Sequence, residues 1–225
     1  MSLWVKICGN TSLKDAQLAV DGGADAVGLV FAPSPRQVTA GEAAAIVHRL
    51  PAEIEKIGVF VDAALEEICS TVRASGLTGV QLHFEAAAEL PAQLHQRLWP
   101  SLRILRVVHF ETAAADLAAR QIAEHVRDPH VDGVLVDSRT AKAVGGTGVA
   151  FDWTAAANAL LQNAEARERR IIAAGGLNPA NVAEAIAALR PWGVDVVSGV
   201  ESAPGRKDPD KVREFVACAR AAQSR

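Results

Sequence analysis

Eight short runs rich in β-branched residues recur at nearly even spacing along the 225 residues, and each is followed by an Ala-, Leu- and Glu-rich helical stretch. Strict alternation of strand and helix predicts a parallel sheet with right-handed crossovers. Eight such units fit a single (β/α)8 TIM barrel of eight parallel strands better than an open doubly wound sheet, although periodicity alone does not exclude the open sheet. The expected strands are Leu3–Cys8, Ala26–Phe31, Lys56–Phe60, Gly79–His83, Ile104–Val108, Gly133–Asp137, Arg170–Ala174 and Val194–Ser198.

Helix signals lie between these strands. Ser12 with Asp15 three residues later is a capping-box variant, and Asn178 before Pro179 places a capping residue ahead of a proline at the first helical position. The clearest helices are expected over Ser12–Val20, Ala40–Leu50, Ala63–Ala74, Thr112–Val126, Pro179–Leu189 and Pro209–Ala222.

No linker rich in Gly, Ser, Pro or charge divides the chain, so residues 1–225 are expected to form one domain. Half of the residues are hydrophobic, which is enough for one large core. The net charge of -3 and the scattered basic residues argue against nucleic acid as a partner.

The expected compartment is the cytoplasm. The N-terminus lacks the charged and apolar regions of a signal peptide, and no apolar run reaches the roughly 18 residues of a membrane span. The three cysteines (Cys8, Cys69 and Cys218) are odd in number and lack metal-ligand spacing, which fits a reducing environment. Cys69 and Cys218 fall in helical patterns and are interpreted as small core residues.

The first expected strand carries the strongest chemical signal. Side chains alternate along it, so Trp4, Lys6 and Cys8 share one face while Val5 and Ile7 share the other. In a barrel, Lys6 and Cys8 would point inward and Cys8 would lie at the mouth. A thiol beside an ammonium group is expected to favour the thiolate. Cys8 is therefore a candidate base or nucleophile.

Other polar residues close further strands, where a barrel of this kind carries its active face. Asp137 ends an apolar run and could be a general acid, or it could cap the following loop. Arg36 follows two prolines and could grip a carboxylate in bidentate fashion, or it could be a solvated surface arginine. His83 shares a strand face with Gln81, but a lone histidine is more often structural, and no metal partner stands at useful spacing in the sequence.

Three glycine-rich segments follow the sixth, seventh and eighth expected strands. Glycine lets backbone N–H groups approach an anion, and barrels often build a phosphate site after strands seven and eight. The alternative is that the glycines only make tight turns. None of the segments is a Walker loop or a dinucleotide fingerprint. They are Gly145-Gly146-Thr147-Gly148, Gly175-Gly176 and Ser198-Gly199.

Taken in order, these segments resemble the phosphoribosylanthranilate isomerase family over nearly the whole chain. That resemblance implies a (β/α)8 barrel. It also implies an Amadori rearrangement of N-(5-phosphoribosyl)anthranilate to a 1-deoxyribulose 5-phosphate in tryptophan biosynthesis, without cofactor or metal. The matching stretches are Lys6-Ile7-Cys8-Gly9, Ser34-Pro35-Arg36, Gln81-Leu82-His83, Leu135-Val136-Asp137-Ser138, Gly145 to Trp153, Ala174 to Leu177 with Asn181-Val182, and Asp195 to Glu201 with Gly205 and Lys207-Asp208.

The resemblance also implies residue roles. Asp137 would be the general acid that opens the ribose ring, and Cys8 the general base that removes the C2 proton. Arg36 would hold the anthranilate carboxylate, and Asp195 would contact a sugar hydroxyl. The implied partner is a small phosphosugar, bound by a monomer or homodimer. The other residues implied to bind substrate are His83 and, around the phosphate, Gly145, Gly146, Gly175, Gly176, Ser198 and Gly199.

One departure from the family pattern concerns the loop after the fourth strand. The family usually has a glycine after Gln-Leu-His, whereas this chain has Phe84. A glycine at positive φ cannot become phenylalanine without strain, so this loop is expected to follow another path.

Two alternative functions stay open from the sequence. One is a related phosphosugar isomerase of histidine biosynthesis, or an enzyme that accepts both substrates. Those barrels carry an aspartate where this chain has Cys8, and they repeat their phosphate loops, which this chain does not clearly do. The other is a phosphate-binding or regulatory barrel that has lost catalysis.

Overall fold

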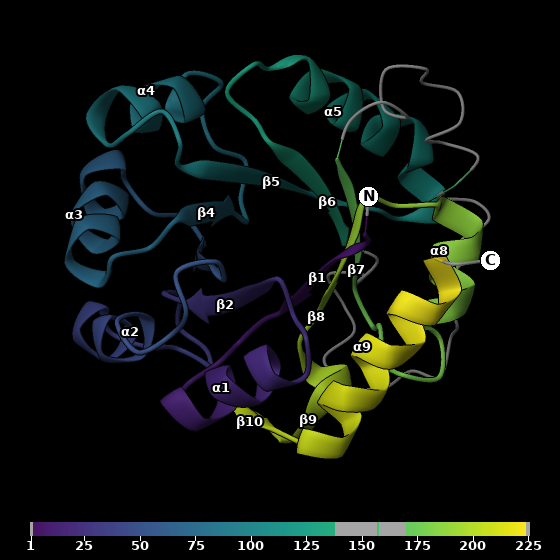
Figure 1. Cartoon of the computed structure of the whole chain (residues 1–225). Helices are drawn as coiled ribbons and strands as arrows, with labels where there is room; N and C mark the ends of the chain where they lie inside the picture. The colour runs from purple at the N-terminus through teal and green to yellow at the C-terminus, as the bar shows by residue number, and fades with distance from the viewer. Residues whose placement is uncertain (1, 138–156, 158–169, 224–225) are drawn as a thin grey trace.

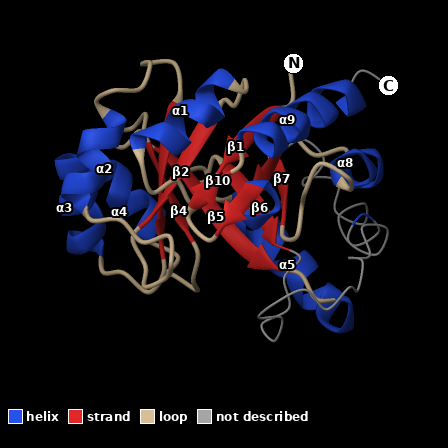
Figure 2. Ribbon diagram, turned by 90° about the horizontal axis from the view of Figure 1, so that it is seen from below, coloured by secondary structure: helices blue, strands red, loops and turns tan. Residues whose placement is uncertain are grey.

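The computed structural model describes residues 2–137, 157 and 170–223. Within them, eight parallel strands close a barrel in sequence order, and the last strand pairs with the first through Val5 and Val194. Helices pack around the outside (Figures 1 and 2). The expected closed (β/α)8 barrel is therefore confirmed, and the open-sheet alternative is wrong.

The strands lie where the sequence predicts them, with ends that shift by one or two residues. The longest strand, β5, extends one residue past each predicted end. The prediction for β6 is confirmed at both ends of the strand. The barrel strands are β1 Trp4–Ile7, β2 Ala26–Val30, β3 Glu55–Phe60, β4 Gly79–Leu82, β5 Arg103–His109, β6 Gly133–Asp137, β7 Ile171–Ala174 and β8 Gly193–Val196.

The described helices follow the predicted pattern, and α4, which was not among the clearest helices, takes the expected place after β4. Ser12 caps α1 by accepting a hydrogen bond from the Asp15 backbone N–H at 3.1 Å, as predicted. The helical elements are α1 Leu13–Asp21, α2 Ala40–Val47, α3 Leu65–Ser75, α4 Leu90–Arg97, the short 3-10 helix η1 Thr112–Ala114, α5 Ala115–Arg127, α8 Val182–Leu189 and α9 Pro209–Gln223. In the described part of the chain, none of them is long and apolar enough to cross a membrane.

The predicted start of the helix at Pro179 is wrong. The Asn178 side chain accepts from the backbone N–H of Ala180 at 2.9 Å, and the Asn181 side chain accepts from that of Asn178 at 2.8 Å. These local bonds form a turn that competes with helical pairing. As a result α8 begins only at Val182, with Asn181 as its N-cap residue.

A small hairpin after β8 was not predicted. A 3-10 helix, η2 (Ser198–Val200), leads into β9 (Glu201–Ala203), which pairs antiparallel with β10 (Arg206–Lys207). Gly205 makes the turn at a φ of 76°, a backbone conformation that favours glycine. The hairpin carries two charged residues, Glu201 and Lys207, to the mouth of the barrel.

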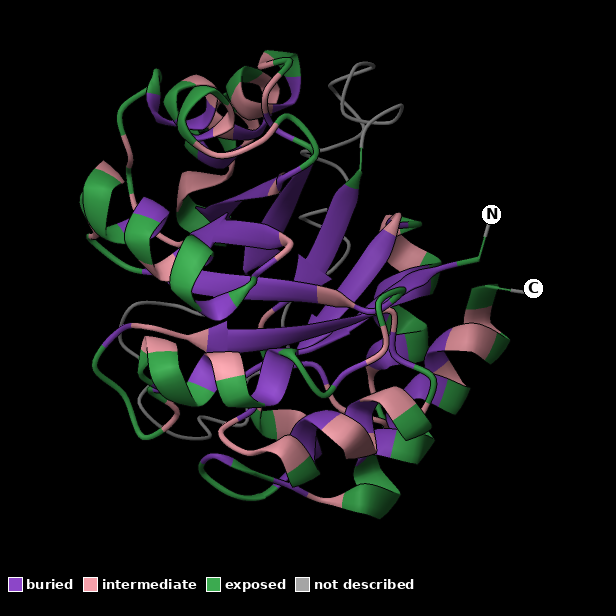
Figure 3. Cartoon of the chain, turned by 60° about the vertical axis from the view of Figure 1, so that its left-hand side comes forward, coloured by how far each residue is buried: buried purple, intermediate pink, exposed green. Residues whose placement is uncertain are grey.

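The core is divided by the barrel wall. Outward-pointing residues such as Val5 and Ile7 pack beneath the helices, whereas Trp4, Ile57 and Leu135 belong to the cluster inside the barrel. As Figure 3 shows, the strands are buried on both sides of the barrel wall, whereas each helix exposes one side. The predicted alternation along the first strand is therefore confirmed.

The upper part of the barrel interior is polar. Lys6 is fully buried, and its Nζ donates to Asp195 Oδ1 and to Gln81 Oε1, both at 2.9 Å. Burial opposes its charge, but Asp195 and then Cys8 outweigh burial, so the pKa of Lys6 is raised above its ordinary value. The buried ammonium is therefore charged and paired.

The Lys6–Asp195 pair gives a test of stability. Lys6→Met leaves the Asp195 carboxylate buried without its cation, so we expect a loss of about 3–5 kcal/mol in the free energy of unfolding. Adding Asp195→Asn removes that stranded charge and should recover more than half of the loss. Urea denaturation of both variants measures this, and equal losses in the single and double variants would contradict it.

Candidate active site

A cavity of about 230 Å³ opens where the barrel strands end. It brings together eight residues that the sequence singles out as functional. Gly199 is not part of its lining, and Gly145 and Gly146 lie outside the described residues. The eight are Cys8, Arg36, His83, Asp137, Gly175, Gly176, Asp195 and Ser198.

Cys8 follows β1 and is held by its backbone, since its N–H donates to Val196 O at 2.8 Å. Burial raises the pKa of the Cys8 thiol, and the neighbouring Lys6 only partly offsets this. Lys6 does favour the thiolate as expected, but burial outweighs this effect, so the thiol form of Cys8 is favoured overall. Burial is the main cause of the raised pKa, and the Asp195 carboxylate adds to it, because Asp195 pairs with the same ammonium group and disfavours a second anion.

Lys207 fixes the backbone around Cys8. Its Nζ donates to Cys8 O at 2.5 Å, to Val197 O at 3.3 Å and to Glu201 Oε1 at 3.1 Å. Burial lowers the pKa of Lys207, although Glu201 opposes that shift. Sequence reasoning assigned no role to Lys207 or Glu201. Gly205 between them was the one signal of a hairpin that would bring both back to the cavity.

Arg36 is not a solvated surface residue. Its Nε and Nη2 donate to the two oxygens of Glu201 at 2.9 and 2.6 Å. Burial works against the Glu201 charge, but Arg36 and Lys207 hold the pKa of that carboxyl below its ordinary value. Gly9, at a φ of 74°, gives Arg36 room, because a Cβ there would lie 2.7 Å from Arg36 Cδ. The guanidinium is thus oriented at the cavity wall by a bidentate ion pair.

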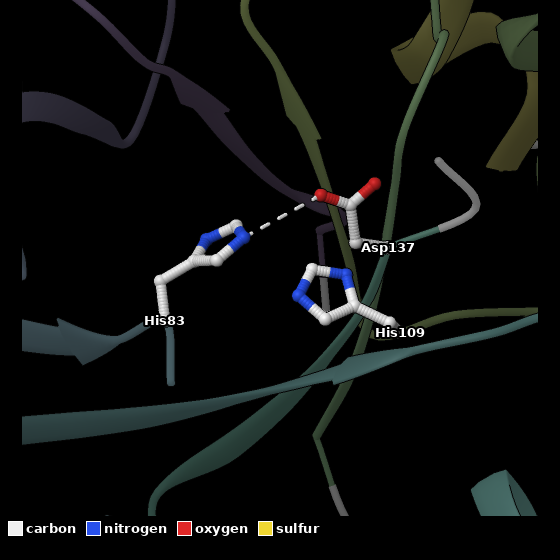
Figure 4. Close-up of side chains that lie close together, drawn as sticks. All are labelled: His83, His109 and Asp137. Atoms are coloured by element: carbon white, nitrogen blue, oxygen red, sulfur yellow. Dashed lines mark ion pairs between the residues drawn. The ribbon is translucent and has the colours of Figure 1, made fainter. Parts of the chain in front are cut away.

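Asp137 is accompanied by two histidines (Figure 4). Its Oδ2 lies 3.9 Å from His83 Nε2, and His109 on β5 is its register partner across the strand pair. The ligand-type atoms of these three residues lie within 4.8 Å of one another, and two histidines with a carboxylate can hold a transition metal. Spacing in the sequence gives no sign of this group, because strand pairing brings together residues that are far apart in sequence.

Phe84 does not strain the loop after β4. It is not among the non-glycine residues with positive φ, and its side chain packs against the main core cluster. His83 nevertheless lines the cavity. The substitution of a family glycine therefore does not keep the histidine out of the site.

The two described glycine-rich segments have different structural roles. Gly175 and Gly176 adopt φ values of 86° and 64°, and both line the cavity. Gly199 instead allows close packing of two loops, since a Cβ there would lie 1.9 Å from Leu177 O. The loops after β7 and β8 thus meet at one side of the cavity, and β1 with Cys8 follows β8 in the barrel.

Comparison with known proteins gives one family. Residues 5–218 match the family described as N-(5′-phosphoribosyl)anthranilate (PRA) isomerase. The chain is similar to the N-(5′-phosphoribosyl)anthranilate isomerase of Pelobacter propionicus, with 43% identity over 221 residues that cover 98% of this chain and 97% of that one.

Solved structures agree. The crystal structure of phosphoribosyl anthranilate isomerase from Thermotoga maritima aligns with a TM-score of 0.84 at 34% identity, over 97% of this chain and 99% of that one. A phosphoribosyl anthranilate isomerase in complex with reduced 1-(o-carboxyphenylamino)-1-deoxyribulose 5-phosphate aligns with a TM-score of 0.78, also at 34% identity and with the same coverage of both chains.

Gly28 on β2 faces the thiol and offers a steric test. A Cβ at Gly28 would lie 2.4 Å from Cys8 Sγ, so Gly28→Ala should force the thiol aside and cost about 1–3 kcal/mol of unfolding free energy by overpacking. The matched control is Gly41→Ala in α2, where an added Cβ meets nothing within 4 Å. Thermal unfolding should show a loss for the first variant only, and equal behaviour of the two would contradict the tight contact.

The Cys8 thiol gives a second test, by alkylation. Because its pKa is raised, less thiolate is present at any given pH, and the alkylation rate should rise with an inflection above the ordinary cysteine value. Reaction with iodoacetamide across pH, followed at the Cys8 peptide by mass spectrometry, measures that inflection. Restricted access lowers the rate at every pH but leaves the inflection in place. An inflection below the ordinary value would mean that Lys6 dominates over burial.

Proposed function

The chain belongs to the N-(5′-phosphoribosyl)anthranilate isomerase family, and on that premise we propose that Asp137 and Cys8 carry its reaction as general acid and general base. The protein is an isomerase of tryptophan biosynthesis. The proposed reaction is the Amadori rearrangement of N-(5-phospho-D-ribosyl)anthranilate to 1-(2-carboxyphenylamino)-1-deoxy-D-ribulose 5-phosphate.

The proposal is supported by one observation above the others. Cys8, Arg36 and Asp137 follow or end three different strands, yet all three line one cavity. A rearrangement of this type needs a proton donor and a proton acceptor that reach the same substrate. The cavity supplies both, together with a cation suited to a carboxylate.

The first step is ring opening. Asp137 gives its proton to the ribose ring oxygen, and the C1–O bond breaks with its electron pair moving to that oxygen. The anthranilate nitrogen shares its lone pair with C1, which produces a protonated Schiff base. Asp137 is 2% exposed, so little water competes for the proton that it delivers.

The second step is proton abstraction at C2. Cys8 first loses its own proton to solvent, and the thiolate then takes the C2 proton; the C–H electron pair forms a C1=C2 bond, and the Schiff-base electrons return to nitrogen. The resulting enolamine becomes the ketone when the C2 hydroxyl loses a proton and C1 gains one. The raised pKa of Cys8 fits this order, because the cationic Schiff base supplies the positive charge that a buried thiolate needs.

Substrate binding is proposed to use the rest of the lining. Arg36 would hold the anthranilate carboxylate, with Glu201 keeping its guanidinium in place. The backbone N–H groups around Gly175, Gly176 and Ser198, together with that of Gly199 next to this lining, would hold the phosphate. Asp195 would accept a hydrogen bond from a sugar hydroxyl while it stays paired with Lys6, and His83 would contact the substrate near Asp137.

Three further expectations accompany this proposal. Residues 1–225 act as one isomerase domain, the protein works in the cytoplasm on a small phosphosugar, and it is a monomer or a homodimer.

Turnover of phosphoribosylanthranilate, generated in situ, tests the proposed roles. Cys8→Ala and Asp137→Ala should each lower kcat by at least about 10²-fold, the loss typical of a missing acid or base. Cys218→Ala and Asp210→Ala remove the same groups away from the cavity and should leave kcat within about twofold of the unmodified protein, as expected for sites outside the reaction.

Other results would point elsewhere. Full activity of Cys8→Ala would exclude the proposed base. An inactive unmodified protein that still binds the reduced product analogue would favour the non-catalytic barrel. Turnover of the histidine-pathway aminoaldose substrate would favour an enzyme that accepts both substrates.

A further inference from the structure

A chain of hydrogen bonds runs across the barrel interior from Lys6 to the neighbourhood of Asp137. The Lys6 Nζ donates to Gln81 Oε1 at 2.9 Å, Gln81 Nε2 lies 3.4 Å from His83 Nδ1, and His83 Nε2 lies 3.9 Å from Asp137 Oδ2. We infer that Gln81 is a positioning residue that fixes His83 in the tautomer with its proton on Nε2, directed at Asp137. The mechanistic part of this inference rests on the proposed role of Asp137.

The ammonium group of Lys6 determines which way the Gln81 amide points. Lys6 offers only donors, so the amide must turn its oxygen towards Nζ. Lys6 is fully buried and Gln81 is 3% exposed, so water does not readily replace that oxygen. The opposite orientation would set an NH₂ group against the ammonium and leave a buried charge without one of its acceptors, which is costly.

The orientation of the amide then determines the protonation of His83. With its oxygen towards Lys6, Gln81 turns its NH₂ group towards His83 Nδ1. That nitrogen must accept, so in the neutral ring the proton lies on Nε2. Histidine tautomers are set in this way by the hydrogen bond that the other ring nitrogen makes.

Backbone geometry holds the arrangement in place. Gln81 and His83 are two residues apart, so both point to the barrel interior. The sheet ladder continues one residue past β4, because the His83 N–H donates to Phe60 O at 2.9 Å. The histidine ring is therefore positioned by a strand end as well as by its side-chain contacts.

The consequence for Asp137 is a directed donor. After Asp137 has given up its proton, the His83 Nε2–H group faces the carboxylate, and a small approach from 3.9 Å gives a charge-assisted hydrogen bond. A donor that meets charge as it develops lowers the barrier without reorganisation of the site. Gln81 acts only through His83 in this respect.

The same tautomer opposes metal binding by His83, His109 and Asp137, although their spacing would suit an ion. A metal at His83 Nε2 requires the ring proton to move to Nδ1, where it would face the Gln81 NH₂ group. Ligating histidines normally donate their other N–H to an acceptor. The only side-chain acceptor of Gln81 is Oε1, which already accepts from Lys6, so it is not directed at His83 Nδ1.

Nitrogen-15 NMR of the histidine side chains tests the tautomer directly. His83→Asn identifies the His83 signals by subtraction among the six histidines. In the unmodified protein at neutral pH, we expect Nε2 to carry the proton and Nδ1 to give the signal of an unprotonated ring nitrogen. A protonated Nδ1, or a fast-exchanging mixture of the two tautomers, would overturn the inference.

Gln81→Glu is the informative variant because a carboxylate can accept from Lys6 and from His83 at once. It should move the proton to Nδ1 and expose the Nε2 lone pair. Zinc chloride titrated into the variant should then bind at least about tenfold more tightly than to the unmodified protein, the size of effect typical of outer-shell partners. Adding His109→Gln should remove that gain.

Gln93→Glu in α4 makes the same charge change at an exposed position and should alter neither the His83 signals nor zinc affinity. Equal zinc binding by the unmodified protein and Gln81→Glu would count against the inference. Should Gln81→Glu fold poorly, Gln81→Met removes the amide with little change in size and should release His83 into a mixture of tautomers. The NMR signals and the zinc affinity do not depend on turnover, so their outcome is independent of the roles proposed for Cys8 and Asp137.

Discussion

The buried ammonium group of Lys6 is the constraint around which the mouth of the barrel is arranged. A charge inside a protein must be paired and hydrogen-bonded, and Lys6 meets this need with Asp195 from β8 and Gln81 from β4. Each partner reaches a different part of the cavity. One ion therefore fixes the carboxylate beside Cys8 and, through the amide, the histidine beside Asp137.

A second ion cluster at the rim has a comparable effect. Glu201 binds Arg36 and Lys207, and Lys207 holds the carbonyl groups of Cys8 and Val197. Each cluster includes one contact that joins the two ends of the chain near the β1–β8 seam, where the barrel closes: Lys6 with Asp195, and Lys207 with the Cys8 carbonyl. The stability of closure and the geometry of the proposed base thus depend on the same contacts.

The electrostatics also suit a reaction that makes a cation. In the protein without substrate, burial dominates at Cys8 and keeps its pKa raised, since Lys6 is already neutralised. A positively charged Schiff base would change that balance at the moment when a base is needed. The environment of Cys8 is therefore better matched to the proposed intermediate than to the empty cavity.

The sequence by itself determined the fold and most of the cavity lining, because both follow from local rules: alternation along each strand fixes which side chains point inward, and parallel strands gather their ends on one face. Cys8, Asp137 and Arg36 were found in this way. Only the tertiary structure decided the partners. Glu201 pairs with Arg36, and His109 lies beside Asp137, although the members of each pair are distant in sequence. Strand register and barrel closure set those distances. The depth of burial raises the pKa of Cys8.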